Sequence, residues 1–176
     1  MVMGAFSHVI EYDGGVMVLQ IGAGSDRTVF SGPLHHLNGR DQWAVGLSAL
    51  PDAMDYDNRS DTDDTAFLQA AGSDPGTIIM DIRKPGGRQW GVDYVRYAIG
   101  HPHESGEPLD TPVTLPGGVH NVGRSEIFVA DEAVELFWSY YKTGDIPSEY
   151  SLRPIDGYTA DGGIYDLRDG APRKVK

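Results

Sequence analysis

Apolar residues at alternate positions, separated by glycine-containing turns, run through the first third of the chain. Residues 6–12 and 16–21 are β-prone and lie on either side of an Asp-Gly-Gly turn sequence at 13–15. Residues 42–50 again alternate, which is the period of a strand. The pattern predicts a β-hairpin and a further strand, with a short strand over 28–30 between them.

Two longer β-rich runs follow, at 77–83 and 88–99, and the sequence Lys-Pro-Gly-Gly at 84–87 separates them. Adjacent strands of this length with several aromatic residues are typical of the centre of an antiparallel sheet. Shorter strands are expected at 125–129 and 150–155. These runs make antiparallel strands the main component of the fold.

The clearest helical pattern lies at 131–142. Acidic residues stand at its start and Lys142 at its end, as the helix dipole favours. Gly144 is suited to follow the last turn, and Pro147 prevents any continuation. The apolar residues that recur at the spacing of one helix face are Ala133, Leu136, Phe137 and Tyr140. We therefore expect one main helix, late in the chain.

Three other segments carry less periodicity. Prolines at four positions make 101–116 an extended, irregular connection. Thr62 is suited to cap a short helix that ends at Gly72. Residues 157–176 are glycine-rich with a basic end, and we expect an irregular C-terminal extension.

Taken together, these elements predict an α+β fold. We expect a mostly antiparallel sheet of about five to seven strands, with one main C-terminal helix packed on one face. The chain has 176 residues, which suits one domain with a hydrophobic core. The predicted organisation is a single domain over 1–156 followed by the extension at 157–176.

The net charge of the chain indicates which class of partner it can bind. The chain has 14 Lys and Arg against 26 Asp and Glu, a formal net charge of −12. Neutralising phosphates requires Lys and Arg, so direct binding of nucleic acid is disfavoured and a basic partner is favoured.

Cysteine content and hydrophobic run length exclude further classes. The chain has no Cys, so disulfides, thiolate metal sites and cysteine nucleophiles are excluded. No apolar run approaches the roughly 18 residues of a membrane span, and residues 1–10 lack the basic start of a secretory signal. We expect a cytoplasmic protein that does not engage a membrane.

Acidic residues are densest at 51–65. Like charges at this density repel, so the segment is predicted to be an exposed loop. A calcium loop starting at Asp55 or Asp57 would lack the Gly and the closing Glu that the EF-hand needs. The segment is therefore interpreted as a solvated loop or as an electrostatic contact for a basic partner. Its acidic residues are Asp52, Asp55, Asp57, Asp61, Asp63 and Asp64.

A histidine cluster offers an alternative chemistry. The set His101, His103, Glu107 and His120 resembles part of the cupin metal signature, in which His-x-His, a Glu and a later His hold a metal in a small barrel. Only 12 residues separate Glu107 from His120, and prolines interrupt the set. A cupin-like, metal-dependent enzyme of the small-barrel type stays as the alternative prediction. The sequence contains no Gly-x-Ser-x-Gly, Walker or His-Glu-x-x-His motif.

The second half of the chain carries a family resemblance. The sequence DEAVELFWSYYKTGDIP at 131–147, a helix followed by Thr-Gly-x-x-Pro, resembles the first numbered immunity-protein family of bacterial polymorphic toxin systems. The segment 125–129 that leads into the helix and the strand-like 150–154 after it are similar in order, so the resemblance covers about 77–155.

The resemblance implies a non-catalytic protein without a cofactor. Such a protein binds and neutralises a cognate toxin domain, often a nucleic-acid deaminase or nuclease, by covering its active site or substrate path. We expect carboxylates to take the place of phosphates in the basic groove of the toxin. A structural or scaffold module without a toxin partner stays open as a third reading. The residues predicted to contact the toxin are Asp55, Asp57, Asp61, Asp63, Asp64, Glu104 and Glu107.

Overall fold

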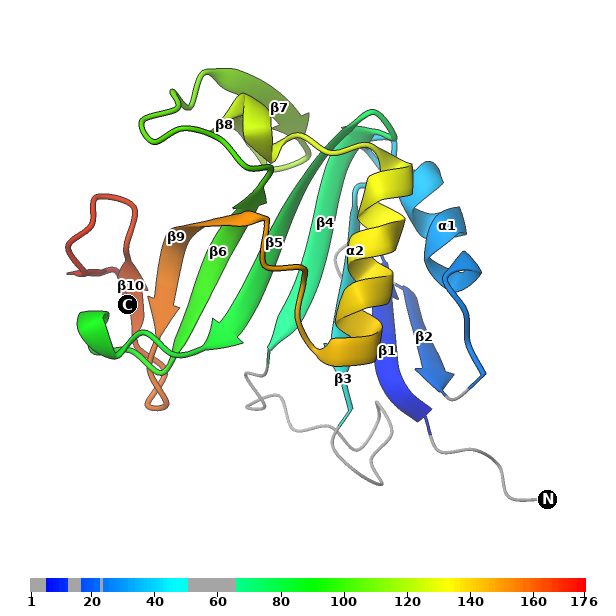
Figure 1. Ribbon diagram of the computed structural model, residues 1–176, viewed down its shortest axis with the longest axis horizontal. Coiled ribbons are helices and arrows are strands. Elements are labelled where there is room, and N and C mark those ends of the chain that lie inside the picture. The colour runs from blue at the N-terminus through cyan, green and yellow to red at the C-terminus, as the bar shows by residue number, and fades with distance from the viewer. Residues whose placement is uncertain (1–5, 13–16, 23, 51–65) are drawn as a thin grey trace.

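The computed structural model describes residues 6–12, 17–22, 24–50 and 66–176, and its centre is one antiparallel sheet (Figure 1). Neighbouring strands are mostly consecutive along the chain, because short turns suffice to connect antiparallel strands. In spatial order the nine strands are β2 (Met17–Gly22), β1 (Phe6–Tyr12), β3 (Ala44–Ala49), β4 (Phe67–Asp74), β5 (Thr77–Pro85), β6 (Tyr94–Gly100), β9 (Ser151–Tyr158), β10 (Ile164–Asp166) and β11 (Arg173–Lys174).

Alternation along the strands gives the sheet two different faces. In β5, Ile78, Met80 and Ile82 are at most 1% exposed and belong to the main hydrophobic core. The residues between them face the other way, since successive side chains of a strand point to opposite faces. The register preserves this division, because Ile82 lies opposite Leu68 of β4 and both are fully buried.

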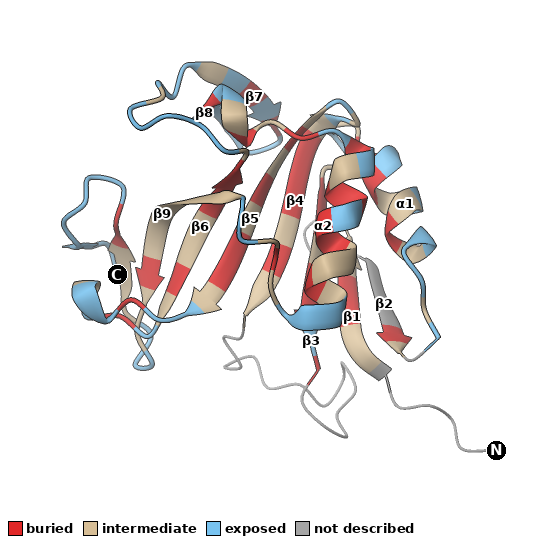
Figure 2. Ribbon diagram, in the orientation of Figure 1, coloured by how far each residue is buried: buried red, intermediate tan, exposed pale blue. Residues whose placement is uncertain are grey.

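Two helices cover the first of these faces: α1 (Thr28–His35) and α2 (Ala130–Thr143) (Figures 1 and 2). Phe30 of α1 and Phe137 of α2 are fully buried, and their ring centroids lie 5.6 Å apart. Gly144 follows α2 with a φ of 74°, a left-handed conformation that costs glycine little. The prediction of a helix at 131–142 is confirmed.

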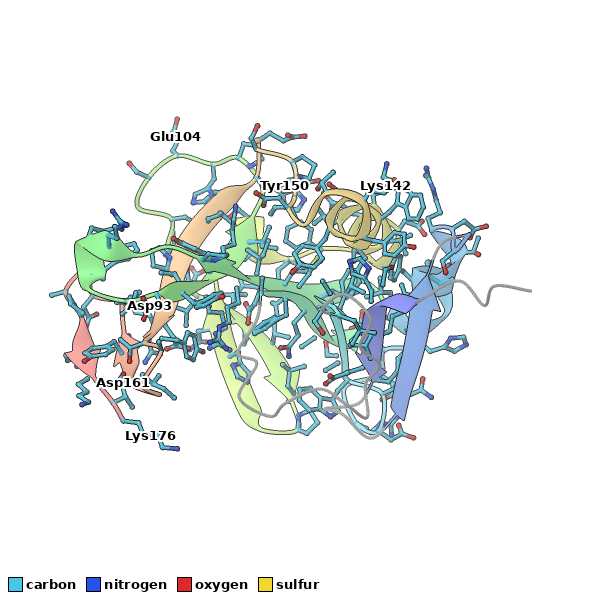
Figure 3. All side chains as sticks on the ribbon, turned by 90° about the horizontal axis from the view of Figure 1, so that it is seen from below. Asp93, Glu104, Lys142, Tyr150, Asp161 and Lys176 are labelled. Atoms are coloured by element: carbon cyan, nitrogen blue, oxygen red, sulfur yellow. The ribbon has the colours of Figure 1, made fainter. Side chains whose placement is uncertain are left out.

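A separate two-stranded hairpin, β7 (Thr111–Leu115) and β8 (Gly118–Val122), lies on the opposite side of the sheet from α2 (Figure 3). It packs through a small cluster of buried residues, in which Val113 and Val122 meet Ala44 of β3 and Ala71 of β4. Most of β8 is exposed (Figure 2). The second face of the sheet is therefore covered less completely than the first.

The strand predicted over 28–30 is wrong, because this segment begins α1. The Asp26 carboxylate accepts a hydrogen bond from the backbone N–H of Thr28 at 2.8 Å, which satisfies one of the free amides at the helix start. Phe30 and Leu34, four residues apart, are both fully buried against the core. The helix is only eight residues long, so its period is hard to see in the sequence.

The short helix predicted from Thr62 to Gly72 is also wrong over its described part. Residues 62–65 lie outside the described residues, and from Phe67 the chain is strand β4. β4 is hydrogen-bonded on one side to β3 and on the other to β5. Pairing on both sides outweighs the weak strand propensity of Ala70 and Ala71.

The fold class is confirmed as α+β with a mostly antiparallel sheet, but the numbers of elements differ. Nine strands form the sheet, and within the described ranges there are two helices rather than one. The connection at 101–116, expected to be irregular, includes β7. The expected strand at 125–129 is a 3-10 turn, η3 (Arg124–Glu126), with a single bridge between Phe128 and Ile78.

The segment 157–176, expected to be irregular, contributes strands to the sheet. β9 continues to Tyr158, and β10 and β11 pair beyond it. Leu167 is 2% exposed and packs with Val92 and Val95 in a small cluster of its own. Hydrogen bonds to β9 and the burial of Leu167 therefore tie the C-terminal segment to the sheet.

Candidate functional site

Of the acidic residues predicted to contact a partner, the structure describes Glu104 and Glu107. Glu104 is exposed in the turn after β6, and its side chain projects outward from the molecule (Figure 3). The structure does not place the five predicted aspartates, because they lie outside the described residues: Asp55, Asp57, Asp61, Asp63 and Asp64.

The Glu107 side chain forms hydrogen bonds within its own chain. Its Oε1 accepts a hydrogen bond from the backbone N–H of Ser125 at 2.9 Å, and its Oε2 accepts one from the Ser125 hydroxyl at 2.5 Å. The Ser125 hydroxyl lowers the pKa of Glu107 below its ordinary value. Both carboxylate oxygens therefore serve to fix the loop after β6 against η3.

His101, from the alternative metal prediction, has both ring nitrogens occupied. Its Nδ1 lies 2.7 Å from the carbonyl oxygen of Ser125, and its Nε2 lies 2.7 Å from Oε1 of Glu132 on α2. The carbonyl and the carboxylate are both hydrogen-bond acceptors, so each ring nitrogen of His101 faces a partner within its own chain. The ring also stacks on Phe128 with centroids 4.5 Å apart. His101 thus joins the end of β6 to α2, and both of its ring nitrogens are engaged within the chain.

The remaining proposed ligands are separated. His103 Nδ1 lies 2.9 Å from the carbonyl oxygen of His101, and its Nε2 is 3.9 Å from Glu107. His120 lies on β8 and lines a cleft on the second face of the sheet. Within the described ranges, no three His, Asp or Glu side chains are grouped to hold a metal ion. The sheet is also open rather than closed into a barrel, so the cupin-like arrangement is not found.

A cleft lies on the second face, between the sheet and the β7–β8 hairpin, and we call it the hairpin cleft. It encloses about 720 Å³ and is lined by residues of β4, β5, β6 and β9 on its floor. Trp43 forms part of its wall, and Val119 and His120 of β8 lie on the hairpin side. Its size falls within the range of small-ligand pockets, roughly 300–1,000 Å³.

Ion pairs occupy the floor of the hairpin cleft. Arg153 of β9 holds Glu126 with two hydrogen bonds, Nε to Oε1 at 2.6 Å and Nη2 to Oε2 at 2.9 Å. Glu126 is 4% exposed and also accepts a hydrogen bond from the backbone N–H of Gly123 at 3.0 Å. A buried carboxylate needs such partners, because its desolvation costs several kcal/mol.

A second set of pairs lies beside the first. Arg96 of β6 donates from Nη2 to Asp156 at 2.6 Å. Arg168 donates to both oxygens of Asp166, and Arg173 donates to the same carboxylate at 2.9 Å. The hydrogen bonds from Arg168 hold the pKa of Asp166 far below its ordinary value. These arginines are therefore committed to carboxylates of their own chain.

Asp81 of β5 is the exception on this floor. It forms an ion pair with Arg96, whose Nη1 lies 3.6 Å from Oδ2, beyond hydrogen-bond distance. No donor in the described part of the chain hydrogen-bonds the Asp81 carboxylate. Burial raises the pKa of Asp81, although the guanidinium groups of Arg96 and Arg153 act in the opposite direction. Asp81 is therefore held by an ion pair, whereas Glu126 is held by hydrogen bonds from Arg153 and Gly123.

The charged floor was not predicted from the sequence. Asp81 and Arg96 stand inside predicted strands, each at a position whose neighbours along the strand are apolar. A charged residue between two apolar residues of a strand is expected to lie on the face opposite the core, and this was the signal that the sequence offered. It could not show that both charges face one cleft, because this depends on strand register and on where the hairpin packs.

None of the helices in the described ranges is both long and apolar enough to cross a membrane. No family model, curated protein or solved structure matches this chain.

Proposed function

We propose that this chain is a non-catalytic immunity protein that binds and neutralises a basic, nucleic-acid-acting toxin domain, such as a deaminase or nuclease. It would act in the cytoplasm of the producing cell and would cover the active site or substrate path of the toxin. The observation that carries the proposal is the charge of −12 on a chain whose sheet leaves one face partly open. The resemblance of 77–155 to an immunity-protein family supports the same function.

Electrostatics makes this pairing favourable. A protein that acts on nucleic acid needs a surface of Lys and Arg to hold phosphates. An acidic protein complements that surface, which speeds the encounter and selects against other partners. Carboxylates placed in the groove compete directly with phosphates for the same basic side chains.

The architecture suits a binding role. The two helices and the main core stabilise one side of the sheet, which leaves the other side available without loss of the core. On that other side the hairpin cleft presents charged and apolar groups together. Occlusion requires only a rigid complementary surface, and it works at one inhibitor per toxin.

The acidic segment at 51–65 supplies the long-range part of the proposed interaction. Seven of the 26 acidic residues and one of the 14 basic residues lie outside the described residues, most of them in this segment. We expect reversal of Asp55, Asp57, Asp61 and Asp63 to Lys to leave folding intact and to weaken toxin binding. Close interfacial charge pairs couple at about 1.5–7 kcal/mol each, so the total loss should reach several kcal/mol.

Co-expression with the toxin domain encoded by the adjacent gene tests the proposal. The expected result is a stable complex with one copy of each chain and a loss of toxin activity that is complete at equimolar addition. Failure to bind this toxin domain would contradict the proposal. Inhibition by far less than one equivalent would also contradict it, because that result indicates turnover.

A further inference from the structure

We propose that His101 forms a proton-dependent clamp, in which an imidazolium ring at neutral pH joins the start of α2 to the end of β6. The clamp consists of the His101 ring, the carbonyl oxygen of Ser125 and the carboxylate of Glu132. It couples folding of the chain to pH. The clamp is a property of the fold and does not depend on the proposed function.

An oxygen atom lies against each ring nitrogen of His101. Nδ1 is 2.7 Å from the carbonyl oxygen of Ser125, and Nε2 is 2.7 Å from Oε1 of Glu132. A backbone carbonyl cannot donate a hydrogen bond, so the hydrogen in the first contact belongs to Nδ1. The second contact needs a hydrogen as well, because two lone pairs repel each other at this distance. The pair therefore holds one proton more than a neutral histidine and an ionised glutamate would hold.

The surroundings favour placing this proton on His101 rather than on Glu132. Histidine is ordinarily about two pH units more basic than glutamate. The His101 ring stacks on Phe128 with centroids 4.5 Å apart, and a cation over an aromatic face is attracted to it. The hydroxyl of Tyr150 donates to the same Glu132 oxygen at 3.3 Å, which favours an ionised carboxylate.

The other carboxylates near the clamp make their contacts elsewhere. Asp131 of α2 lies 2.8 Å from His35, and Glu126 is held in the ion pair on the cleft floor. Glu107 accepts hydrogen bonds from Ser125 with both of its oxygens. The titratable and charged groups on the elements around the ring are Asp131 and Glu132 on α2, His103 and Glu107 after β6, Arg124 and Glu126 in η3, and Glu149 and Tyr150 before β9.

A second histidine has the same two kinds of partner and provides a comparison. His35 Nδ1 lies 2.8 Å from the carbonyl oxygen of Ser31, and its Nε2 lies 2.8 Å from Oδ1 of Asp131. The Asp131 side chain is 89% exposed, whereas that of Glu132 is 30% exposed. Water therefore screens the His35 pair more strongly, and the His101 pair is the one expected to keep its proton.

A proton that the folded state keeps makes stability depend on pH. The unfolded chain releases this proton as the pH rises through about 6.5. Above that pH, folding takes up a proton, so the contribution of the clamp is complete below about 6.5 and is lost progressively as the pH rises. Because Glu132 lies in the first turn of α2, the loss falls on the junction between this helix and the sheet.

Nitrogen-15 NMR of the histidine rings in the full chain at pH 7.5 tests the clamp directly. We expect both ring nitrogens of His101 to carry hydrogen. His36 is the internal control, because within the described ranges its ring has a carbonyl partner, Gly32 at 2.6 Å, and no carboxylate. Its ring should carry one hydrogen at this pH. A His101 ring with only one hydrogen would overturn the proposal.

Glu132→Gln is the matched variant, because its side-chain amide can donate to Nε2 of a neutral ring. The folded wild type would then hold one proton more than the folded variant. The unfolding equilibrium constant of the wild type, divided by that of the variant, should therefore rise about tenfold per pH unit between pH 6.5 and 7.5. Denaturant titration at both pH values measures this ratio, and a ratio that does not change with pH would overturn the clamp.

Asp131→Asn is the control at the adjacent position of α2. It also removes a carboxylate from a histidine, but from the more exposed pair, so the same ratio should change much less with pH. A change as large as that for Glu132→Gln would overturn the assignment of the proton to His101. The NMR measurement needs only the wild-type chain, so the proposal is tested even if Glu132→Gln does not fold.

Discussion

The two faces of the nine-stranded sheet use the same strands for different purposes. On the face covered by α1 and α2, Ile78 and Ile82 of β5 are fully buried in the main core. On the other face, Asp81 of the same strand opens into the hairpin cleft, beside Arg96 of β6. The first face is filled by buried apolar side chains, whereas the second has a cavity of about 720 Å³ with ion pairs on its floor.

The difference follows from the period of the strand. Successive side chains point to opposite faces, so one strand can contribute to stability on one side and to recognition on the other. Because packing on the helix face fixes the backbone, the charged residues opposite it are held in place without packing of their own. The comparison predicts that substitutions on the helix face change stability, whereas substitutions on the cleft floor change charge balance and binding.

The largest expected effect is that of Phe137→Ala on the helix face. Phe137 is fully buried against Phe30, and its removal leaves a cavity that the core cannot close. We expect the free energy of unfolding to fall by about 3–5 kcal/mol, measured by denaturant titration. A loss of less than about 1 kcal/mol would contradict the assignment of this face as the stabilising core.

A smaller loss is expected for Glu126→Ala beside the cleft. The substitution leaves Arg153 and the backbone N–H of Gly123 without their acceptor. The free energy of unfolding should fall by about 1–3 kcal/mol. Glu126→Gln is the matched control, since it keeps a carbonyl acceptor for Gly123 and loses only the ion pair. Equal effects of the two substitutions would show that the backbone hydrogen bond contributes nothing.

Asp81→Asn is expected to raise the free energy of unfolding, whereas the two substitutions above lower it. Burial raises the pKa of Asp81 in the folded state, so the folded protein binds this proton more tightly than the unfolded chain. The ionised group therefore lowers the stability above its folded pKa. We expect Asp81→Asn to be slightly more stable than wild type at pH 7.

This gain should shrink as the pH falls, and should vanish below about 3.9, the ordinary pKa of Asp. Thermal unfolding of both proteins across this pH range checks the prediction. A variant that is less stable than wild type at pH 7 would show that the ion pair with Arg96 outweighs the cost of burying the Asp81 carboxylate.

The smallest effect on stability is expected for Val119→Ser at the mouth of the cleft. Val119 is 62% exposed, so the free energy of unfolding should change by less than about 0.5 kcal/mol. The affinity of the Val119→Ser variant for the toxin domain, measured by calorimetry, should nevertheless fall, because the apolar contact at the mouth of the cleft is lost. Unchanged affinity would exclude this side of the hairpin from the interface.

Much of the helix face could be predicted from the sequence. The stripe that includes Leu136 and Phe137 indicated α2, and the runs around Ile78 and Tyr97 indicated β5 and β6. These signals are strong because burial imposes a period on many residues at once. The helix α1 was missed because eight residues provide too few repeats, and β4 because its pairing on both sides is not visible locally.

The cleft could be predicted much less well. Each of its charges is a single polar residue within an apolar pattern, and Asp81 and Arg153 are far apart along the chain. Their proximity depends on strand order and on the position of the β7–β8 hairpin, which packs through a few residues such as Val113. A local sequence pattern contains no information about strand order or about the position of the hairpin. The cluster of aspartates at 51–65, by contrast, is visible in the sequence alone.

The salt dependence of toxin binding tests the central claim most directly. Isothermal titration of the toxin domain with the full chain should give one site per toxin at low salt. Because the contact is proposed to be between an acidic protein and a basic groove, the affinity should fall at least tenfold between 50 and 500 mM NaCl, a range over which the screening length drops well below about 10 Å. Binding that is absent, or that is equally tight at both salt concentrations, would contradict the account.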